Sequence, residues 1–394
     1  MAPTRNEATL DDARNLLVAA PEQRLGFDFF GSVVTELPDD VAGKSLYLTG
    51  DISRLRPRLD GAARVFVVEE LSHGYDDALA RIALGKVPIR VGGGVYYRRF
   101  FGEADDFHRI AAEHTFQTLT ESVKPSKARR TGIYLTPVSQ RGDELHFHLL
   151  RCSTNLSGPT ESFCATDRRI VDALNDEAAF VFGPHATLNH VLAQIYANAP
   201  AADGRKQTKA KISAHADKTK DMPVDGIMAF CTFYDGLGML SPLASDPFDL
   251  GHKGRSGLTR LQFRLKEPAL KREGLLPAFS VTLYPGSVFF MPLSTNRLYT
   301  HEIQSSILDA QMLPTRLGYV VRCSKTAAVH KAGETFLNLD GGLVPLEPPT
   351  PEGMAALREL YAAENRSDGF IDYGDKFRFS MNEGDYRAPD PKRA

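Results

Sequence analysis

The chain has 394 residues, and its 47 basic and 49 acidic residues give a formal net charge of −2. With 42% hydrophobic and 24% charged residues, it has the composition of a soluble globular protein. This composition excludes a largely disordered chain, a collagen-like repeat and a coiled coil. A net charge so close to zero excludes a global field that would draw the protein to nucleic acid or a membrane, so such binding would need a local basic patch.

The sequence carries no sign of export or of membrane insertion. Its N-terminal residues are charged early and lack the apolar run of about 7 to 15 residues that a secretory signal needs. No apolar stretch approaches the roughly 18 residues of a transmembrane helix. The four cysteines lie far apart without a CxxC spacing, which disfavours a disulfide framework or a zinc knuckle. We therefore expect a soluble intracellular protein, in cytoplasm or nucleus, with reduced thiols.

Helices and short strands are predicted to alternate over residues 1–180. In chain order, the expected elements are a helix over 1–20, short apolar runs at 45–50 and 63–71, a turn at Gly92-Gly93-Gly94, a helix over 105–123, two strands at 132–138 and 145–152 joined by a turn at 140–143, and a helix over Thr166–Ala179. The glycines are not expected to bind phosphate, because neither GK[ST] nor GxGxxG is present.

Apolar, β-branched and aromatic runs dominate residues 185–325. Gly, Pro and Asp separate these runs, which are VLAQIYA, GIMAFCTFY, LQFRL, FSVTLY, SVFFMPL and LGYVVRC. Many short strands of this kind predict a sandwich or jelly roll. The Gly-, Ser- and Pro-rich stretch Leu237–Thr259 is expected to be a long loop, and a helix is expected near Pro351–Asn365.

A possible metal site begins at the pair His215 and Asp217. Residues two apart on an extended backbone point to the same face, so an imidazole and a carboxylate can reach one metal together. The best candidate for a third ligand is His301, 84 residues after Asp217, in a segment expected to be strand, turn and strand. Two His and one carboxylate form the facial triad of non-haem Fe(II) oxygenases, whose open positions take a 2-oxo acid and dioxygen. Arg316, 15 residues further on, offers a planar donor for the remote carboxylate of that acid.

Four segments within residues 188–323 resemble the AlkB-like branch of the 2-oxoglutarate- and Fe(II)-dependent oxygenases. They are HVLAQIYANAP, KISAHADKTKD, YPGSVFFMPLSTNRLYTHEI and RLGYVVR, which correspond to the family's Asn-x-Tyr strand, its HxD segment, its segment ending in the distal His, and its Arg-x5-Arg pair. The resemblance covers about 135 residues, counted over 188–323.

The resemblance implies that His215, Asp217 and His301 bind Fe(II). It further implies that Arg316 grips a carboxylate of 2-oxoglutarate, and that Arg322, Tyr196 and Gln194 complete the pocket. The expected fold is α+β, with a double-stranded β-helix (jelly-roll) core over 181–330, a mixed α/β region over 1–180 packed on it, and an extension over 331–394. The implied activity is a dioxygenase that consumes O2 and 2-oxoglutarate, releases succinate and CO2, and hydroxylates or oxidatively demethylates its substrate.

The chain departs from the family pattern at several points. Gln194 stands where the family has Asn, and Ser287 stands where an Asp follows the Gly. The gaps from Tyr196 to His215 and from Asp217 to His301 are longer than usual in the family. None of these departures involves a metal ligand, so they bear on the substrate more than on the chemistry.

Three readings of the substrate and activity stay open. Family analogy favours a modified nucleic-acid base, and a basic loop, Arg205–Lys211, with Arg205, Lys206, Lys209 and Lys211, could dock a phosphate backbone near the site mouth. The same chemistry could instead act on a small molecule or a protein side chain. A third reading, from another class, is a catalytically degenerate AlkB-like binding module. The intact HxD…His…Arg set speaks against it, because such a module has no need for an open metal site.

Overall fold

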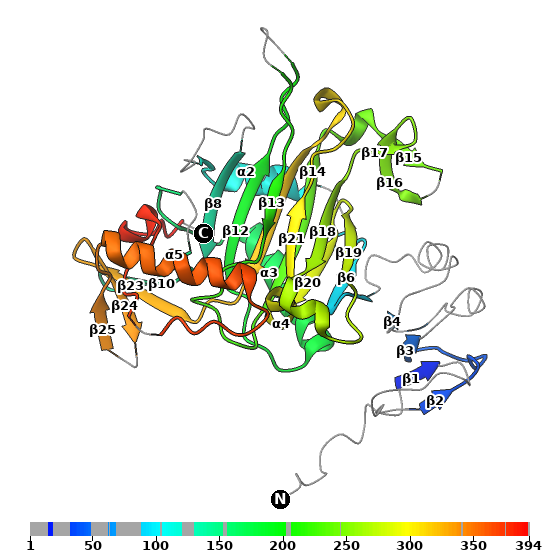
Figure 1. Ribbon diagram of the computed structural model, residues 1–394, viewed down its shortest axis with the longest axis horizontal. Helices are drawn as coiled ribbons and strands as arrows, with labels where there is room; N and C mark the ends of the chain where they lie inside the picture. Colours follow the sequence, from blue (N-terminus) through cyan, green and yellow to red (C-terminus); the bar gives the residue numbers. More distant parts are fainter. Residues whose placement is uncertain are drawn as a thin grey trace, which may run out of the picture. The chain divides into compact units, whose positions relative to one another are not determined.

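The computed structural model describes residues 15–18, 32–48, 62, 64–67, 88–102, 105–119, 130–152, 156–201, 206–244, 246–339, 342–374 and 376–392. The protein is mixed α+β, with many short strands and few helices (Figure 1). It divides into two compact units, Met1–Gly102 and Glu103–Ala394. The division lies at Gly102 and not near residue 180, because strands between 105 and 180 pair with strands of the second unit.

The first unit contains a mostly parallel sheet in the order β2-β1-β3-β4-β5-β6. Its strands are β1 (Asn15–Val18), β2 (Ser32–Val34), β3 (Ser45–Leu48), β4 (Arg64–Val67), β5 (Ile89–Val91) and β6 (Gly94–Tyr97). The predicted helix over 1–20 is wrong at 15–18, where the run Asn-Leu-Leu-Val forms β1; the rest of it lies outside the described residues. β1 lies between β2 and β3 and buries both Leu16 and Leu17, so pairing within a sheet overrides the helical spacing of these leucines.

The predicted glycine turn is confirmed. Gly92 and Gly93 connect β5 to β6, and Val91 pairs with Gly94 across the hairpin. Both glycines have positive φ, 53° and 85°, as a two-residue hairpin turn of this hand requires.

Two sheets of the second unit carry most of the strands predicted over 185–325. The larger has the order β11-β8-β12-β22-β14-β20, with β7 paired to β8, and the smaller has the order β13-β21-β18-β19. The larger sheet contains β7 (Gln117–Thr118), β8 (Arg130–Thr136), β11 (Glu161–Ser162), β12 (His190–Tyr196), β14 (Ile227–Asp235), β20 (Val288–Pro292) and β22 (Thr315–Arg322). The smaller contains β13 (Ile212–His215), β18 (Thr259–Leu265), β19 (Ala278–Leu283) and β21 (Tyr299–Ile303).

These two sheets pack face to face through aromatic side chains. Phe263 of β18 contacts Phe289 of β20 with ring centroids 5.2 Å apart, and Phe230 of β14 lies 5.5 Å from the ring of His301 on β21. Burial alternates along β21, where Tyr299, His301 and Ile303 point inward. The period of two along this strand is therefore what turns His301 toward the larger sheet.

A five-stranded antiparallel sheet, β25-β24-β23-β10-β9, completes the second unit's main strands. It contains β9 (Ser139–Arg141), β10 (Glu144–Leu149), β23 (Thr326–Lys331), β24 (Glu334–Leu339) and β25 (Gly342–Pro345). The strands predicted at 132–138 and 145–152 both exist as β8 and β10, but they lie in different sheets. The turn at Gly142 joins β10 to the added strand β9 instead.

The stretch 237–259 is not simply a loop. It forms a small three-stranded sheet of β15 (Ser241–Leu243), β16 (Asp246–His252) and β17 (Arg255–Ser256). Gly251 permits the close approach of β17, since a Cβ there would lie 2.2 Å from the Arg255 carbonyl oxygen. Small residues thus allow tight pairing here rather than an open loop.

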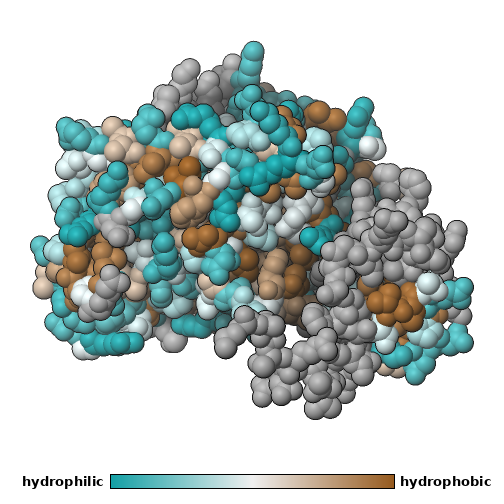
Figure 2. Space-filling view, turned by 60° about the horizontal axis from the view of Figure 1, so that its bottom comes forward, coloured by the Kyte–Doolittle hydropathy of each residue, from teal (hydrophilic) through white to brown (hydrophobic). Residues whose placement is uncertain are grey.

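Four α-helices are described: α2 (Asp106–Glu113), α3 (Ala165–Phe182), α4 (Leu293–Leu298) and α5 (Pro351–Arg366). The helices predicted over Thr166–Ala179 and Pro351–Asn365 are confirmed. The helix predicted over 105–123 ends early, at Glu113, and the turn predicted before His301 contains α4. Within the described residues, no helix is long and apolar enough to cross a membrane. One face of the molecule shows its hydrophobic residues as separate patches among hydrophilic ones (Figure 2).

Candidate functional site

Two neighbouring strands of the smaller sheet bring His215, Asp217 and His301 together. His215 is the last residue of β13 and pairs directly with His301 of β21, so their rings lie with centroids 4.4 Å apart. Asp217 follows after one residue, with its Oδ1 3.9 Å from His215 Nε2. One ligand atom from each of the three lies within 4.8 Å of the others. This spacing lets all three side chains reach one metal ion.

The surroundings hold two of these side chains in the protonation states that a metal needs. Burial raises the pKa of Asp217, but the Arg322 guanidinium and the nearby imidazoles outweigh this and lower it to about 2. Burial, together with the neighbouring His215, lowers the pKa of His301 to about 3. At neutral pH Asp217 is therefore ionised and His301 is a neutral imidazole, which are the forms that coordinate divalent metals.

The three residues line a cavity of about 250 Å³ between the two packed sheets. All seven residues named from the sequence line it: Gln194, Tyr196, His215, Asp217, His301, Arg316 and Arg322. Within the described chain, eleven buried side-chain polar atoms have no hydrogen-bond partner, and five of them belong to residues of this cavity. These five are Arg130 Nε, Asp217 Oδ2, Thr232 Oγ1, His301 Nδ1 and Arg322 Nη1. Buried polar atoms without partners are costly, so their concentration here indicates a place for a polar ligand.

Arg316, at the start of β22, occupies the other end of the cavity. Its guanidinium lies 4.3 Å from the centroid of the Tyr196 ring, which comes from the paired position on β12. The Tyr196 hydroxyl donates to Gln194 Oε1 at 2.6 Å. Gly318 leaves room for this arrangement, because a Cβ there would lie 2.8 Å from Arg316 Nη1. Stacking on one side fixes the plane of the guanidinium, and among the described residues no carboxylate forms an ion pair with it.

Arg322, at the other end of β22, forms a hydrogen bond with Asp217 of the candidate metal site. Its Nη2 donates to Asp217 Oδ1 at 3.2 Å, and the buried Asp217 charge raises the pKa of Arg322 although burial alone lowers it. The two arginines thus lie on the same face of one strand, six residues apart. One contacts the carboxylate of the metal-binding set, and the other faces the far end of the cavity.

The charge of the lining favours an anionic ligand. Four basic side chains, Arg130, Lys218, Arg316 and Arg322, stand against the single carboxylate of Asp217. Arginines present planar donors that match a carboxylate with two hydrogen bonds. A dicarboxylate that spans the cavity would meet cations along its length.

Residues that no sequence motif indicated hold the backbone around His215 and Asp217, the candidate metal-binding segment. Asn296 of α4 accepts from the Asp217 N–H at 2.9 Å and donates to the Asp217 carbonyl at 2.8 Å. Asn365 and Glu364 of α5 accept from the N–H groups of Ala216 and Thr219. No local motif marks these residues; only the fold brings them to residues 216–219.

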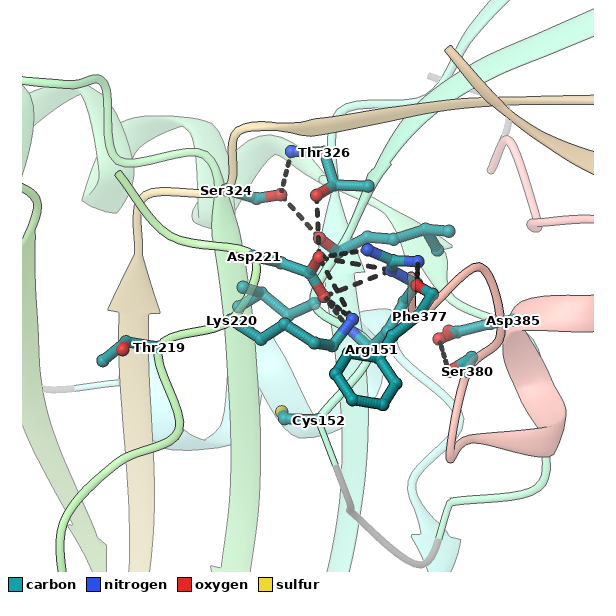
Figure 3. Close-up of polar contacts among 12 residues, drawn as sticks. Arg151, Cys152, Thr219, Lys220, Asp221, Ser324, Thr326, Phe377, Ser380 and Asp385 are labelled. Carbon is teal, nitrogen blue, oxygen red and sulfur yellow. Dashed lines mark hydrogen bonds and ion pairs between the residues drawn. The ribbon is translucent and has the colours of Figure 1, made fainter. Parts of the chain in front are cut away.

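Four residues beyond Asp217, a second buried carboxylate is fully paired (Figure 3). Asp221 accepts from Arg151 Nη2 at 2.6 Å, from the Arg151 backbone N–H at 2.8 Å and from Thr326 Oγ1 at 2.9 Å, and Lys220 Nζ lies 3.1 Å away. Arg151 also donates to the Phe377 carbonyl at 2.7 Å. These contacts join the segment after the metal-binding residues to β23 and to the C-terminal region.

The basic loop lies at the end of the cavity where Arg316 is found, away from His215, Asp217 and His301. Arg205 is outside the described residues, Lys206 is exposed, and Lys209 donates to the Ser306 carbonyl at 2.8 Å. Lys211 lines a second cavity, of about 450 Å³, which shares Arg316 and Tyr196 with the first. None of His215, Asp217 and His301 lines this second cavity. A ligand on this loop would therefore approach the Arg316 end.

A second cluster with metal-ligand chemistry lies near α3 and is internally paired. It contains Glu113, His114, Cys164 and Asp167. His114 contacts Asp167 through Nε2 at 2.7 Å and Glu161 through Nδ1 at 2.8 Å. Burial lowers the pKa of His114, but these two carboxylates outweigh it and raise the pKa to about 9. Both ring nitrogens are occupied, so this histidine serves as a buried cation.

Comparison with protein-family models finds no match to the chain, and no curated protein matches its sequence. Among solved structures, OsALKBH1 is similar over 59% of this chain and 99% of its own, with 14% identity and a TM-score of 0.34. The non-heme α-ketoglutarate-dependent epimerase SnoN from nogalamycin biosynthesis is similar over 70% of this chain and 97% of its own, with 15% identity and a TM-score of 0.35. Its complex with Fe3+, α-ketoglutarate and nogalamycin RO has a TM-score of 0.34. At these TM-scores the likenesses assign no function to the chain, and what it can do follows from the residues of its cavity.

Proposed function

We propose that the protein is an Fe(II)- and 2-oxoglutarate-dependent oxygenase. One observation carries the proposal: His215, Asp217 and His301 converge in a single cavity that Arg316 also lines. The donor set fits Fe(II), since two imidazoles and one carboxylate on one side leave coordination positions open. Asp217 Oδ2 and His301 Nδ1 are buried without hydrogen-bond partners among the described residues, as a site built for an ion requires.

The strand topology supports the same proposal. From β12 to β14 and again from β19 to β22, consecutive strands alternate between the larger and the smaller sheet. Four adjacent strands of the larger sheet, β12, β22, β14 and β20, pack against the smaller sheet of β13, β21, β18 and β19. We infer that these eight strands form a double-stranded β-helix, with the metal-binding residues on its smaller sheet.

The roles of the chain's own residues follow from their positions. His215, Asp217 and His301 would hold Fe(II), and Arg322 orients the Asp217 carboxylate through its hydrogen bond. Arg316, held flat by Tyr196, would bind the remote carboxylate of 2-oxoglutarate, with Thr232 and Gln194 beside it. Phe230 and Phe263 pack against the His301 ring and keep water from that side. When bound, Fe(II) and 2-oxoglutarate would supply the activation of dioxygen for oxidation of a substrate C–H bond.

Hydroxylation and demethylation differ only in the atom beside the oxidised carbon. Hydroxylation of an N-methyl carbon gives an N-hydroxymethyl group, whose C–N bond breaks to release formaldehyde and leave N–H, whereas hydroxylation of a carbon skeleton leaves a stable alcohol. We propose a modified nucleic-acid base as the substrate to test first, supported by Lys211, which lines the second cavity with Arg316, and by Lys209, which contacts Ser306 of the same cavity. A small molecule or a protein side chain is the alternative.

The test is succinate formation from 2-oxoglutarate by Fe(II)-loaded protein in air, with and without methylated oligonucleotides. We expect Fe(II)-dependent turnover that is lost in His215→Ala and kept in His146→Ala, a histidine of β10 outside the cavity. Stimulation by oligonucleotides that weakens with added salt would support the nucleic-acid substrate. Turnover that persists in His215→Ala would overturn the assignment of the metal-binding residues.

A further inference from the structure

The backbone from Ala216 to Thr219 lies outside regular secondary structure, yet the N–H groups of Ala216, Asp217 and Thr219 are satisfied. β13 ends at His215, and no strand continues through Asp217. Ala216 and Asp217 are both buried, so their N–H groups cannot turn to water. Unpaired buried N–H groups are costly, and the partners found for these groups therefore fix the local conformation.

Three side chains accept these N–H groups in turn. The Ala216 N–H donates to Asn365 Oδ1 at 2.7 Å, and the Asp217 N–H donates to Asn296 Oδ1 at 2.9 Å. The Thr219 N–H donates to the Glu364 carboxylate at 3.1 Å, and the Thr219 hydroxyl donates to the same group. Two of the three acceptors belong to the last turn of α5, nearly 150 residues away in sequence.

The end of α5 is itself firmly held. Lys266, just after β18, donates to the carbonyl oxygens of Glu364 at 2.6 Å and Ser367 at 3.0 Å. A lysine at this position satisfies two carbonyls of the helix end and complements its dipole. The Tyr373 hydroxyl donates to the Glu364 carboxylate from the other side. Asn365 Nδ2 donates to the Tyr361 carbonyl at 3.1 Å, which fixes the direction of its Oδ1.

The C-terminal region is tied to the chain just after the metal-binding residues as well. Figure 3 shows Arg151 between Asp221 and the Phe377 carbonyl, so the region beyond α5 is joined to residue 221 through one buried guanidinium. Lys218 lies 4.6 Å from the centroid of the Tyr361 ring. The stretch 216–221 therefore contacts the C-terminal region at both of its ends.

We propose that α5 is a positioning element of the metal site, acting through Asn365 and Glu364. The Ala216 N–H belongs to the peptide group that joins His215 to Ala216, so its bond to Asn365 fixes the peptide plane that follows His215. Asn296 fixes the next plane, which precedes Asp217. Loss of the Asn365 acceptor lets the first plane rotate and shifts His215 relative to Asp217. This inference rests on the proposed function, because it assumes that His215 and Asp217 bind a metal.

The experiment measures Mn2+ affinity by electron paramagnetic resonance, in the full chain and without turnover. We expect Asn365→Leu, which is similar in size and cannot accept a hydrogen bond, to weaken Mn2+ binding about 10-fold, the lower range for residues that orient metal ligands. Asn365→Ala serves as a second non-accepting variant. Asn365→Asp keeps an acceptor oxygen, and we expect its Mn2+ affinity to stay within about threefold of native or better. Glu359→Ala, an exposed residue of the same helix, is the matched control and should bind as the native chain does.

The apparent KM for 2-oxoglutarate at saturating Fe(II) distinguishes a loss of positioning of the metal-binding residues from general damage to the cavity. It should stay within about twofold in Asn365→Leu, since Arg316 lies on β22 and is held by Tyr196 of β12. Native Mn2+ affinity in folded Asn365→Leu would overturn this inference and leave the proposed function intact. Absence of Mn2+ binding by the native chain would overturn both. If neither Asn365→Leu nor Asn365→Ala folds, then Asn365 is needed by the whole fold, and a role limited to positioning the metal-binding segment is overturned.

Discussion

Asp217 and Asp221 are two buried carboxylates only four residues apart, and their surroundings differ. Asp221 accepts hydrogen bonds on both oxygens, from Arg151 and Thr326, with Lys220 beside it. Asp217 accepts one bond from Arg322 on Oδ1, and its Oδ2 has no partner among the described residues. Both lie near positive charge, which lowers the pKa of each below its usual range despite burial. The two carboxylates differ in how many of their oxygens accept hydrogen bonds. Asp221, with both oxygens paired, stabilises the fold, and Asp217, with one oxygen paired, is available to a ligand.

The largest expected effect is on metal binding. His215→Ala removes one of three ligands, and since even residues that only orient ligands contribute 10- to 100-fold, we expect Mn2+ affinity to fall more than about 100-fold. Succinate formation should be lost with it. Electron paramagnetic resonance titration checks the affinity, with His146→Ala as control. A loss of less than about threefold would contradict the proposed coordination.

The second prediction concerns the free energy of unfolding, to which the fully paired carboxylate of Asp221 should contribute more than that of Asp217. Asp221→Ala leaves Arg151 and Lys220 buried without their partner, so we expect a loss of roughly 3–5 kcal/mol in the free energy of unfolding. Asp217→Ala should cost clearly less, because only Arg322 loses a partner. Urea unfolding of the two variants measures the contrast. Equal losses would show that the two carboxylates serve the same purpose.

Arg316 carries the third prediction. Arg316→Met keeps much of the side chain's bulk but removes a charge-assisted pair of hydrogen bonds to the co-substrate, worth about 1.5–3 kcal/mol. We expect the KM for 2-oxoglutarate to rise roughly 10- to 100-fold with metal affinity unchanged. Arg316→Lys should recover only part of this, since an ammonium cannot bind a carboxylate through two parallel bonds. Steady-state kinetics at saturating Fe(II) tests both variants.

The paired cluster around His114 predicts a pH dependence of stability. Its pKa is raised from about 6.5 to about 9 in the folded protein, because Asp167 and Glu161 outweigh the effect of burial. The contribution of protonated His114 to the free energy of unfolding is therefore complete below pH 6.5. It is lost as the pH rises through 9, which lowers the free energy of unfolding by about 2–3 kcal/mol. Urea unfolding at pH 6.5 and 9.5 measures it, with His114→Gln removing the dependence. A flat profile in the native chain would show that His114 is not a buried cation.

The smallest predicted effect concerns Gly318. A Cβ at this position would lie 2.8 Å from Arg316 Nη1, so Gly318→Ala should push the guanidinium from its place over Tyr196. We expect the KM for 2-oxoglutarate to rise by about 2- to 10-fold, less than in Arg316→Met, with Mn2+ affinity unchanged. Kinetics that match the native chain would show that Arg316 does not need its present position.

Local pattern pointed to His215, Asp217, His301 and Arg316, and the family resemblance added Arg322, Tyr196 and Gln194. The period of two explains the inward position of His301 on β21 and the shared face of Arg316 and Arg322 on β22. It does not explain Asp217, which lies beyond the end of β13 and is held by side chains from other elements. The strand runs over 185–325 are equally visible, because apolar, β-branched and aromatic residues recur in them and Gly, Pro and Asp separate them. The structure brings all seven named residues to one cavity.

What the sequence did not reveal depends on pairing across long distances. Leu16 and Leu17 fit a helix until β2 and β3 pair on either side of them. The stretch 237–259 has the composition of a loop, because its three strands are short and rich in small residues. Asn365 and Glu364 carry no signal of their own, because their partners lie nearly 150 residues away. Contacts of this kind are set by tertiary packing, which a single sequence does not encode in any local pattern.

The most direct test of the central claim is the visible absorption of the anaerobic protein on addition of Fe(II) and then 2-oxoglutarate. A metal-to-ligand charge-transfer band arises only when both bind together, so no substrate needs to be known. The account predicts a band at one equivalent of Fe(II), absent in His215→Ala and requiring far more 2-oxoglutarate in Arg316→Met. Absence of the band in the folded native chain, or an equal band in His215→Ala, would contradict it.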